Sequence, residues 1–299
     1  MLDQLTGFVL EPTNICTLKC SKCPRTVFID KFPSKWVNKQ LNLDHLKNFI
    51  DVDINKKMFI ISGTSGDPIY YNDLFELVLW IKQNGGLVTI ETNGSYKSRE
   101  WWKKICSLLD ENDAVVFAID GIPENFTKYR INADWQSIKV GIEETVKTTR
   151  SVWKFIPFAF NENNIQQATK ISTDLGMYKF YLDPSSRWSG DDDPLKPTSL
   201  VNKRSEHVLQ WVTKSNIEID AKCKKNNNEH FIMADGFYVP CCVVADSRFY
   251  YSSEFYKNKD KYDISKTTIT QVLENLKEFY ETIEEKKLRY CTFECPKLP

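Results

Sequence analysis

Short apolar runs alternate with amphipathic stretches along the first 184 residues, and this alternation constrains the fold more than any other feature. Several of the runs are almost continuously apolar, as strands covered on both faces are. The expected strands are Phe8–Glu11, Met58–Ser62, Leu87–Thr92, Ala114–Asp120, Phe155–Phe160 and Phe180–Asp183. Apolar residues at helical spacing predict helices at Leu43–Phe49, Leu74–Ile81, Trp101–Leu109, Ile138–Thr148 and Ile165–Leu175.

This order of elements predicts an α/β fold with right-handed β-α-β units and a parallel sheet, either barrel-like or doubly wound. In both architectures, functional residues gather at the C-terminal ends of the strands. The pattern breaks at Ser185–Ser199, where Ser, Asp and Pro residues indicate a linker or a loop across a barrel mouth. Helices are expected near Ser205–Thr213 and Ile269–Ile283. We therefore expect an α/β domain at residues 1–184, a linker with a bridging helix at 185–222, and a small domain at 223–299.

Charge and hydropathy exclude several classes of protein. The chain has 40 basic and 40 acidic side chains, so no general nucleic-acid binding is expected. No apolar run approaches the ~18 residues of a membrane helix, and the N-terminus does not resemble a secretory signal. These features predict a cytoplasmic protein with no membrane association. In that setting, nine cysteines with clustered positions favour metal ligation over disulfide bonds.

Three cysteines follow the first expected strand at a spacing of Cys16-x3-Cys20-x2-Cys23. A structural zinc site or an electron-transfer [4Fe–4S] cluster normally has a fourth protein ligand. Three thiolates would instead leave one iron of a cubane open to a small molecule. The alternative is a zinc site that takes a distant cysteine as its fourth ligand.

Short motifs recur at the ends of the next strands. TSGDP at Thr64–Pro68 follows the second strand, TNG begins at Thr92, and AIDG at Ala118–Gly121 ends the fourth. With the three cysteines, they resemble the radical S-adenosylmethionine (SAM) family. The resemblance implies a partial (β/α)6 TIM-like barrel, with a [4Fe–4S] cluster on Cys16, Cys20 and Cys23. It also implies SAM-binding roles for Ser62, Gly63, Ser65, Gly66, Asp67, Pro68, Thr92, Asn93, Asp120 and Arg130.

Four residues depart from the family pattern: Ser65 replaces a glycine, Ala118 replaces a serine, and the other two are Asp67 and Lys22. Asp67 replaces the usual glutamate, and Lys22 stands where an aromatic residue commonly precedes the third cysteine. The implied chemistry needs an external one-electron reductant such as flavodoxin or ferredoxin. Reductive cleavage of SAM then gives a 5′-deoxyadenosyl radical, which abstracts hydrogen from a substrate.

A second group of cysteines lies near the C-terminus. Cys223-x12-Gly236-x4-Cys241 resembles the opening of a SPASM or twitch extension, and Gly236 fits a tight hairpin turn. With Cys291 and Cys295, this set would hold one auxiliary [4Fe–4S] cluster, as in the single-cluster twitch form, although four cysteines suit zinc equally well. Cys242 competes with Cys241, which the Gly-x4-Cys spacing favours. Cys106 is expected to be a buried apolar residue of a helix.

The sequence leaves the substrate open. The resemblance favours a peptide or protein substrate, with dehydrogenation of a sugar or alcohol as an alternative. A non-catalytic iron–sulfur electron carrier or a zinc scaffold is the alternative of another class. Dehydrogenation would need a base, and Asp183 or Asp235 is the candidate, although capping of a helix or turn explains either residue more simply.

Overall fold

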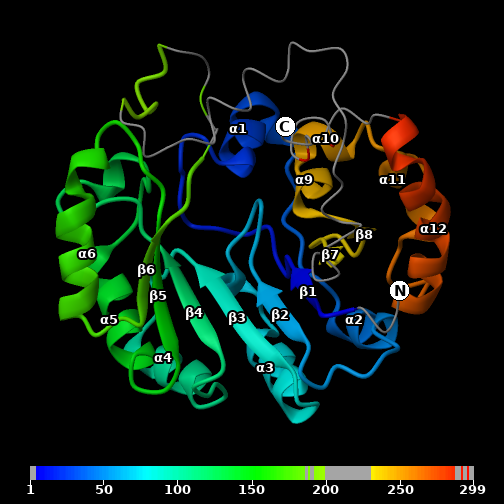
Figure 1. Cartoon of the computed structure of the whole chain (residues 1–299), viewed down its shortest axis with the longest axis horizontal. Coiled ribbons are helices and arrows are strands. Elements are labelled where there is room, and N and C mark those ends of the chain that lie inside the picture. Colours follow the sequence, from blue (N-terminus) through cyan, green and yellow to red (C-terminus); the bar gives the residue numbers. More distant parts are fainter. Residues whose placement is uncertain are drawn as a thin grey trace.

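The structure is a computed structural model of the whole chain, and the residues it describes are 5–185, 188, 192–198, 230–286, 291 and 295. Its core is an eight-stranded sheet with the order β6-β5-β4-β3-β2-β1-β7-β8 (Figure 1). Neighbouring strands from β1 to β6 are parallel, as the sequence predicts for a partial barrel. These six strands are β1 (Gly7–Leu10), β2 (Met58–Ile61), β3 (Leu87–Thr92), β4 (Ala114–Ala118), β5 (Arg150–Phe155) and β6 (Lys179–Leu182).

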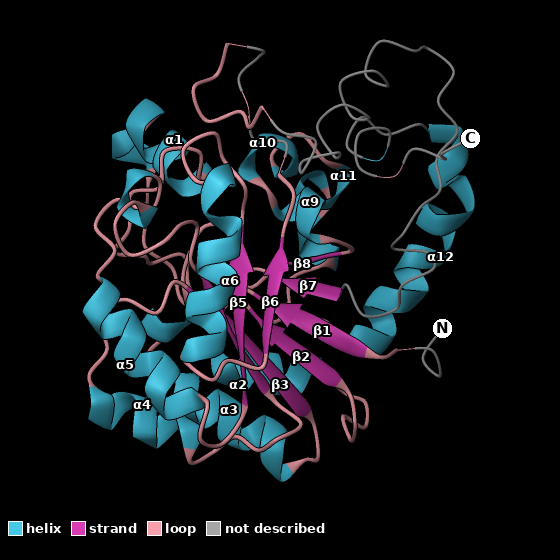
Figure 2. Cartoon of the chain, turned by 60° about the vertical axis from the view of Figure 1, so that its left-hand side comes forward, coloured by secondary structure: helices cyan, strands magenta, loops and turns pink. Residues whose placement is uncertain are grey.

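Helices cover the outer face of this sheet, and the apolar core lies between the two layers (Figure 2). Polar caps begin several of the helices: the side chains of Asn42, Ser98 and Asp134 accept hydrogen bonds from backbone amides of the first turns. The covering helices are α2 (Leu43–Phe49), α3 (Leu74–Gln83), α4 (Arg99–Cys106), α5 (Trp135–Thr145) and α6 (Ile165–Asp174). Cys106 is 4% exposed on α4, as the sequence predicts.

The fifth strand corrects the sequence prediction. It spans Arg150–Phe155, whereas the prediction placed it at Phe155–Phe160. Pro157 has no amide hydrogen for a strand ladder, so the apolar run cannot continue as a central strand. Phe158 is instead buried in a second apolar cluster, which Cys16 and Cys23 contact and Cys20 joins.

The C-terminal segment extends the same sheet. β7 (His230–Ile232) pairs in parallel with β1, and β8 (Tyr238–Val239) pairs antiparallel with β7. The long helix α12 (Ile269–Lys286) packs the buried side chains of Ile269, Val272 and Leu276 into the main core. The other helices are α1 (Pro24–Lys31), α9 (Cys242–Ala245), α10 (Ser247–Tyr250) and α11 (Glu254–Lys257), with 3-10 turns η2 (Pro33–Lys35), η3 (Pro68–Tyr70), η4 (Phe126–Lys128), η5 (Glu162–Asn164) and η7 (Lys259–Lys261). The helix expected near Ser205–Thr213 lies outside the described residues.

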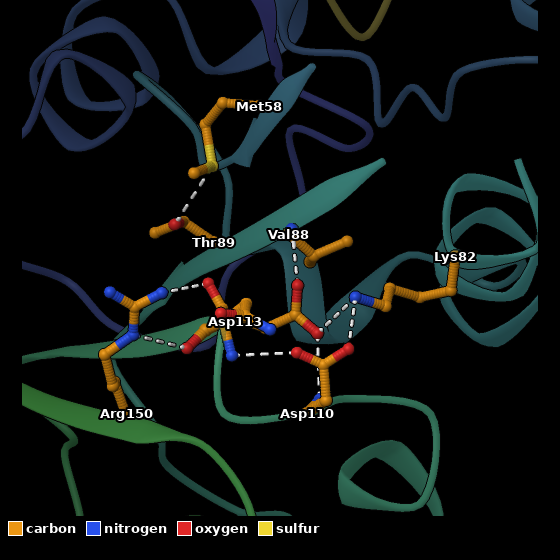
Figure 3. Close-up of polar contacts among 8 residues, drawn as sticks. Met58, Lys82, Val88, Thr89, Asp110, Asp113 and Arg150 are labelled. Atoms are coloured by element: carbon orange, nitrogen blue, oxygen red, sulfur yellow. Dashed lines mark hydrogen bonds and ion pairs between the residues drawn. The ribbon is translucent and has the colours of Figure 1, made fainter. Parts of the chain in front are cut away.

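A network of hydrogen bonds and ion pairs links the N-terminal ends of the strands to the neighbouring loop and helix (Figure 3). The buried Asp113 carboxylate accepts hydrogen bonds from the Val88 amide at 2.8 Å and from the Asp110 amide at 2.9 Å. Lys82 pairs with both aspartates, at 2.9 Å from Asp110 and 2.8 Å from Asp113. These contacts lie at the starts of β3 and β4, so the opposite edge carries the functional loops. Among the described residues, none of the helices has the length and apolar character needed to cross a membrane.

Candidate active site

A cavity of about 160 Å³ lies at the C-terminal ends of the core strands. Every one of the six parallel strands, or the loop that follows it, contributes to its walls, as the sequence predicts for this edge. Its lining includes Cys16, Cys20, Cys23, residues 63–67 and 91–93, Ala118, Arg130, Lys154 and Asp183. Three expected SAM-binding residues lie behind this surface: Ser62, Pro68 and Asp120 are not part of the lining.

The three cysteines share one wall of the cavity. Cys20 is buried, and Cys16 and Cys23 are half-buried. The Cys23 amide donates to the Cys20 carbonyl at 3.0 Å, so the chain turns tightly just before Pro24 starts α1. The Cys16 sulfur accepts hydrogen bonds from the Leu18 amide at 3.4 Å and from Asn93 Nδ2 at 3.6 Å. The loop therefore curls so that all three thiols face one space.

The chemistry of this wall fits an iron–sulfur cluster. Burial raises the pKa of the Cys16 thiol to about 12, and the charge of Asp67 adds to this effect. Thiolates at this position therefore need a bound cation to stabilise them. In a cubane each thiolate binds a different iron, so three thiols that line one wall of a cavity are the ligand set that a cluster with one open iron needs.

The loop after β2 is fastened directly to the cysteine loop. The Asp67 amide donates to the Ile15 carbonyl at 2.9 Å. A Cβ on Gly66 would lie 1.8 Å from the Thr13 carbonyl oxygen, so only glycine allows this approach. The backbone of the TSGDP motif therefore lies in direct contact with the cysteine loop, beside the proposed cluster site.

Asp67 fixes this loop to the end of β3. Its Oδ1 accepts hydrogen bonds from Thr92 Oγ1 at 2.8 Å and from the Ile69 amide at 3.2 Å. Its Oδ2 accepts from the Asn93 amide at 2.7 Å and also from Asn93 Nδ2. The side chain is 3% exposed. The expected contact between Asp67 and the SAM ammonium stays a prediction, and the contacts observed within the chain make this carboxylate a positioning group.

Asp67→Asn should lower the free energy of unfolding by about 2–3 kcal/mol, because one carboxylate acceptor becomes an NH2 group that faces buried donors. The matched control is Asp174→Asn, which removes an exposed ion pair with Lys170 and should cost at most about 0.5 kcal/mol. Anaerobic urea unfolding of the reconstituted proteins measures both. Equal midpoints for the two variants would contradict the positioning role.

Arg130 provides a fixed positive charge beside the thiols. Its Nε lies 2.7 Å from Asp120 Oδ2, and Asp120 is fully buried. Asp120 Oδ1 accepts from the Ile156 amide at 2.8 Å, which holds the carboxylate in place. Although burial opposes the charge of Arg130, Asp120 and Cys20 keep its pKa above its usual value. The guanidinium can therefore bind an anionic group of a ligand in the cavity.

An ion group on β3, on β5 and just after β6 lines the same cavity. Lys154 Nζ of β5 lies 3.4 Å from Glu91 Oε2 of β3 and 3.3 Å from Asp183 Oδ2, just after β6. Burial would lower the pKa of Lys154, but the two carboxylates raise it above its usual value. Asp183 was expected from the sequence, whereas Glu91 and Lys154 were not. Glu91 directly precedes the TNG motif, and this position was the available signal for it.

The other expected base, Asp235, lies elsewhere. It pairs with Lys39 at 3.1 Å and lines a second cavity, not the one that contains the cysteines. Lys22, the unusual residue before Cys23, pairs with Asp193 at 2.6 Å. This contact joins residues 192–198 to the cysteine loop.

The second group of cysteines is partly described. Gly236 has φ of +82° in the turn between β7 and β8, which confirms the expected hairpin. Cys241, Cys291 and Cys295 all belong to or pack against the main core, whereas Cys242 is exposed. The Cys295 amide donates to the Cys291 carbonyl at 2.8 Å. Cys223 lies outside the described residues.

Comparison with known proteins adds a family and two kinds of relative. The sequence profile described as "Radical SAM superfamily" matches residues 10–169. AdoMet-dependent heme synthase from Methanosarcina barkeri is 28% identical over 232 residues, which cover 71% of this chain and 60% of that protein. The chain therefore spans less than two thirds of the length of this relative.

Two solved structures share the fold at low sequence identity. Streptococcus suis SuiB bound to SAM has a TM-score of 0.59 at 13% identity, and the match covers 81% of this chain and 61% of SuiB. Native anSMEcpe with bound AdoMet and a peptide has a TM-score of 0.57 at 15% identity, and the match covers 97% of this chain and 88% of that chain. At these identities, the similarity is one of fold.

Proposed function

The chain belongs to the radical SAM superfamily, and on that premise we propose that it modifies a peptide or protein substrate with the help of an auxiliary [4Fe–4S] cluster. The chain is a radical SAM enzyme, so SAM and one [4Fe–4S] cluster are implied as its cofactors. One observation carries the proposal for the site. A single cavity combines three thiols from the loop after β1 with an ion group on β3, on β5 and just after β6.

Cys16, Cys20 and Cys23 would hold the SAM-binding cluster. When bound, the cluster and SAM supply reductive cleavage of SAM and hydrogen abstraction from the substrate. Arg130 would bind the carboxylate of SAM, because it is a half-buried cation of the cavity wall whose charge acts on the Cys20 thiol. The backbone of residues 63–66 would form the neighbouring wall, held in place by Asp67. An external one-electron reductant, such as flavodoxin or ferredoxin, would complete the system.

Asp183 would accept a proton if the substrate is oxidised. Its carboxylate lines the cavity, and its side chain is 35% exposed. Lys154 would fix its direction, and Glu91 would hold Lys154 from the other side. Asp183→Asn should therefore slow product formation while formation of 5′-deoxyadenosine continues.

Cys223, Cys241, Cys291 and Cys295 would hold the auxiliary cluster. The exposure of Cys242 and the packing of Cys241 beside the core support Cys241 as the ligand. In this proposal residues 1–184 form the catalytic barrel, residues 185–222 the linker and residues 223–299 the twitch-like region. About eight iron atoms per chain would support two clusters, whereas about four iron atoms with one zinc would contradict the auxiliary cluster.

The fold of anSMEcpe, whose structure contains a peptide, supports a peptide or protein substrate. The 28% identity to an AdoMet-dependent heme synthase favours a second candidate, a tetrapyrrole substrate. A sugar or alcohol remains the small-molecule alternative to both.

Anaerobic turnover with SAM and dithionite tests the proposal. Mass spectrometry should detect 5′-deoxyadenosine and methionine, and a true substrate should accelerate their formation. A deuterated form of that substrate should transfer deuterium to 5′-deoxyadenosine. Short peptides, a porphyrin and a sugar alcohol are the three probes. Acceleration by the porphyrin alone would replace the peptide proposal with the tetrapyrrole one. Iron loading without any 5′-deoxyadenosine would contradict the assigned site.

A further inference from the structure

A second cavity, of about 220 Å³, lies between the cysteine-loop region and the C-terminal segment. Asn14, the segment around Trp36 and Lys39, and the turn after β7 form its walls together with Tyr250 of α10. Figure 1 shows α1 and α10 next to each other at this place. Ser65 lines both this cavity and the one that contains the cysteines, so the two spaces are neighbours across the TSGDP loop.

Two polar atoms in this cavity lack a partner in the part of the chain that the structure describes. They are Tyr250 Oη and Asp235 Oδ1, and both are buried. Tyr250 is only 2% exposed, and the other oxygen of Asp235 pairs with Lys39 at 3.1 Å. Buried polar atoms are normally hydrogen-bonded, and a buried polar atom without a partner destabilises the folded protein. Asp235 Oδ1 can only accept, and Tyr250 Oη can accept as well as donate, so both atoms suit a ligand that supplies hydrogen-bond donors.

Glu11 adds a second carboxyl group to the same space. It is 3% exposed, and it accepts hydrogen bonds from the Ser65 amide at 2.7 Å and from Thr64 Oγ1 at 3.0 Å. Burial raises the pKa of Glu11 to about 7, and the negative charge of Asp235 also contributes. Two lysines, Lys35 and Lys39, also line this cavity; both are exposed, and Lys39 is already paired with Asp235.

Aromatic rings form much of the remaining wall. Phe28, Trp36, Tyr250 and Tyr251 all line the cavity. Aromatic faces attract cations, with Trp and Tyr among the best, and this attraction grows when water is excluded. Anionic ligands such as carboxylates or phosphates would meet Asp235 and Glu11 and be repelled.

We propose that this cavity binds a primary ammonium group, either of a free amine or of a lysine side chain or N-terminus of a peptide. An ammonium has three N–H donors, and Asp235 Oδ1, Tyr250 Oη and Glu11 provide three acceptors. The aromatic walls hold the carbon chain of the same ligand. In this role Asp235 is a binding residue of the second cavity, not a base of the first.

Calorimetric titration of the reconstituted protein with n-butylamine at pH 7.5 tests the site, with n-butanol as the neutral probe of equal length. Butylamine should bind at least about tenfold more tightly than butanol, because only butylamine brings charged hydrogen-bond donors to the carboxylates. A short lysine peptide and the same peptide with acetylated lysine and N-terminus distinguish the two sources. Tighter binding of the lysine peptide than of butylamine assigns the site to peptides, and the reverse order assigns it to free amines.

Variants make this test specific. Tyr250→Phe and Asp235→Asn should each weaken amine binding about tenfold, whereas Tyr178→Phe, on a 67% exposed residue outside the cavity, should not change it. Tyr250→Phe should keep its melting temperature, because the hydroxyl it removes has no partner among the described residues. Equal binding of butylamine and butanol, or unchanged amine binding in both variants, would overturn the proposal. These results do not depend on SAM cleavage, so they separate this site from the proposed function.

Discussion

Cys20→Ser should abolish the SAM-dependent formation of 5′-deoxyadenosine, with a loss of at least about 100-fold. Cys20 is the most buried of the three thiols, at 6% exposed, and the positive charge of Arg130 acts on its thiol. Serine is a poor ligand for iron, and only two thiols would remain to hold the proposed cluster. Mass spectrometry of the anaerobic reaction measures the product. Iron analysis should show about four fewer iron atoms per chain than in the wild type.

Cys106→Ser and Cys242→Ser are the matched controls. Cys106 is buried on α4 and Cys242 is exposed, and neither lines the cavity with Cys20. Both variants should keep their iron content and their activity within about twofold. Substantial 5′-deoxyadenosine formation by the Cys20 variant would remove this thiol from the ligand set.

Much of the barrel was predictable because local patterns carry it. The strands β1 to β4 each bury a short apolar run, and their ends bear the motifs around Cys16, Asp67 and Asn93. Residues that follow consecutive parallel strands meet at one edge, so their order in the sequence is enough to predict that they meet. The prediction of β5 was wrong because hydropathy alone favours a strand at Phe155–Phe160. The hydrogen-bond ladder between strands needs backbone amide hydrogens, and Pro157 has none.

Other parts of the site depend on contacts between distant residues. Lys154 was missed because the shifted strand placed it before β5, although it faces the cavity between Glu91 and Asp183. The second cavity joins Glu11 and Lys39 to Asp235 and Tyr250 across more than half of the chain. No local pattern brings such residues together; the pairing of β7 with β1 and the contact of α1 with α10 do so.

Arg130→Lys should raise the KM for SAM by about 10–100-fold while leaving the cluster content unchanged. Lysine keeps the positive charge, but it lacks the planar fork that can bind Asp120 and a carboxylate ligand at the same time. The buried Asp120 carboxylate keeps a cationic neighbour, so the variant should fold. Arg130→Ala would leave that carboxylate unpaired and should cost about 3–5 kcal/mol of stability. The lysine variant therefore separates ligand binding from folding.

Arg99→Lys is the control for this substitution. Arg99 also pairs with carboxylates, those of Glu143 and Glu144, but it is partly exposed and lies outside the cavity. Its KM for SAM should stay within about twofold of the wild type. Initial rates of 5′-deoxyadenosine formation across a range of SAM concentrations measure both variants. If only the KM rises in Arg130→Lys, Arg130 binds SAM directly, as its position next to Asp120 implies. If only kcat changes, Arg130 acts instead on the cysteine wall beside Cys20.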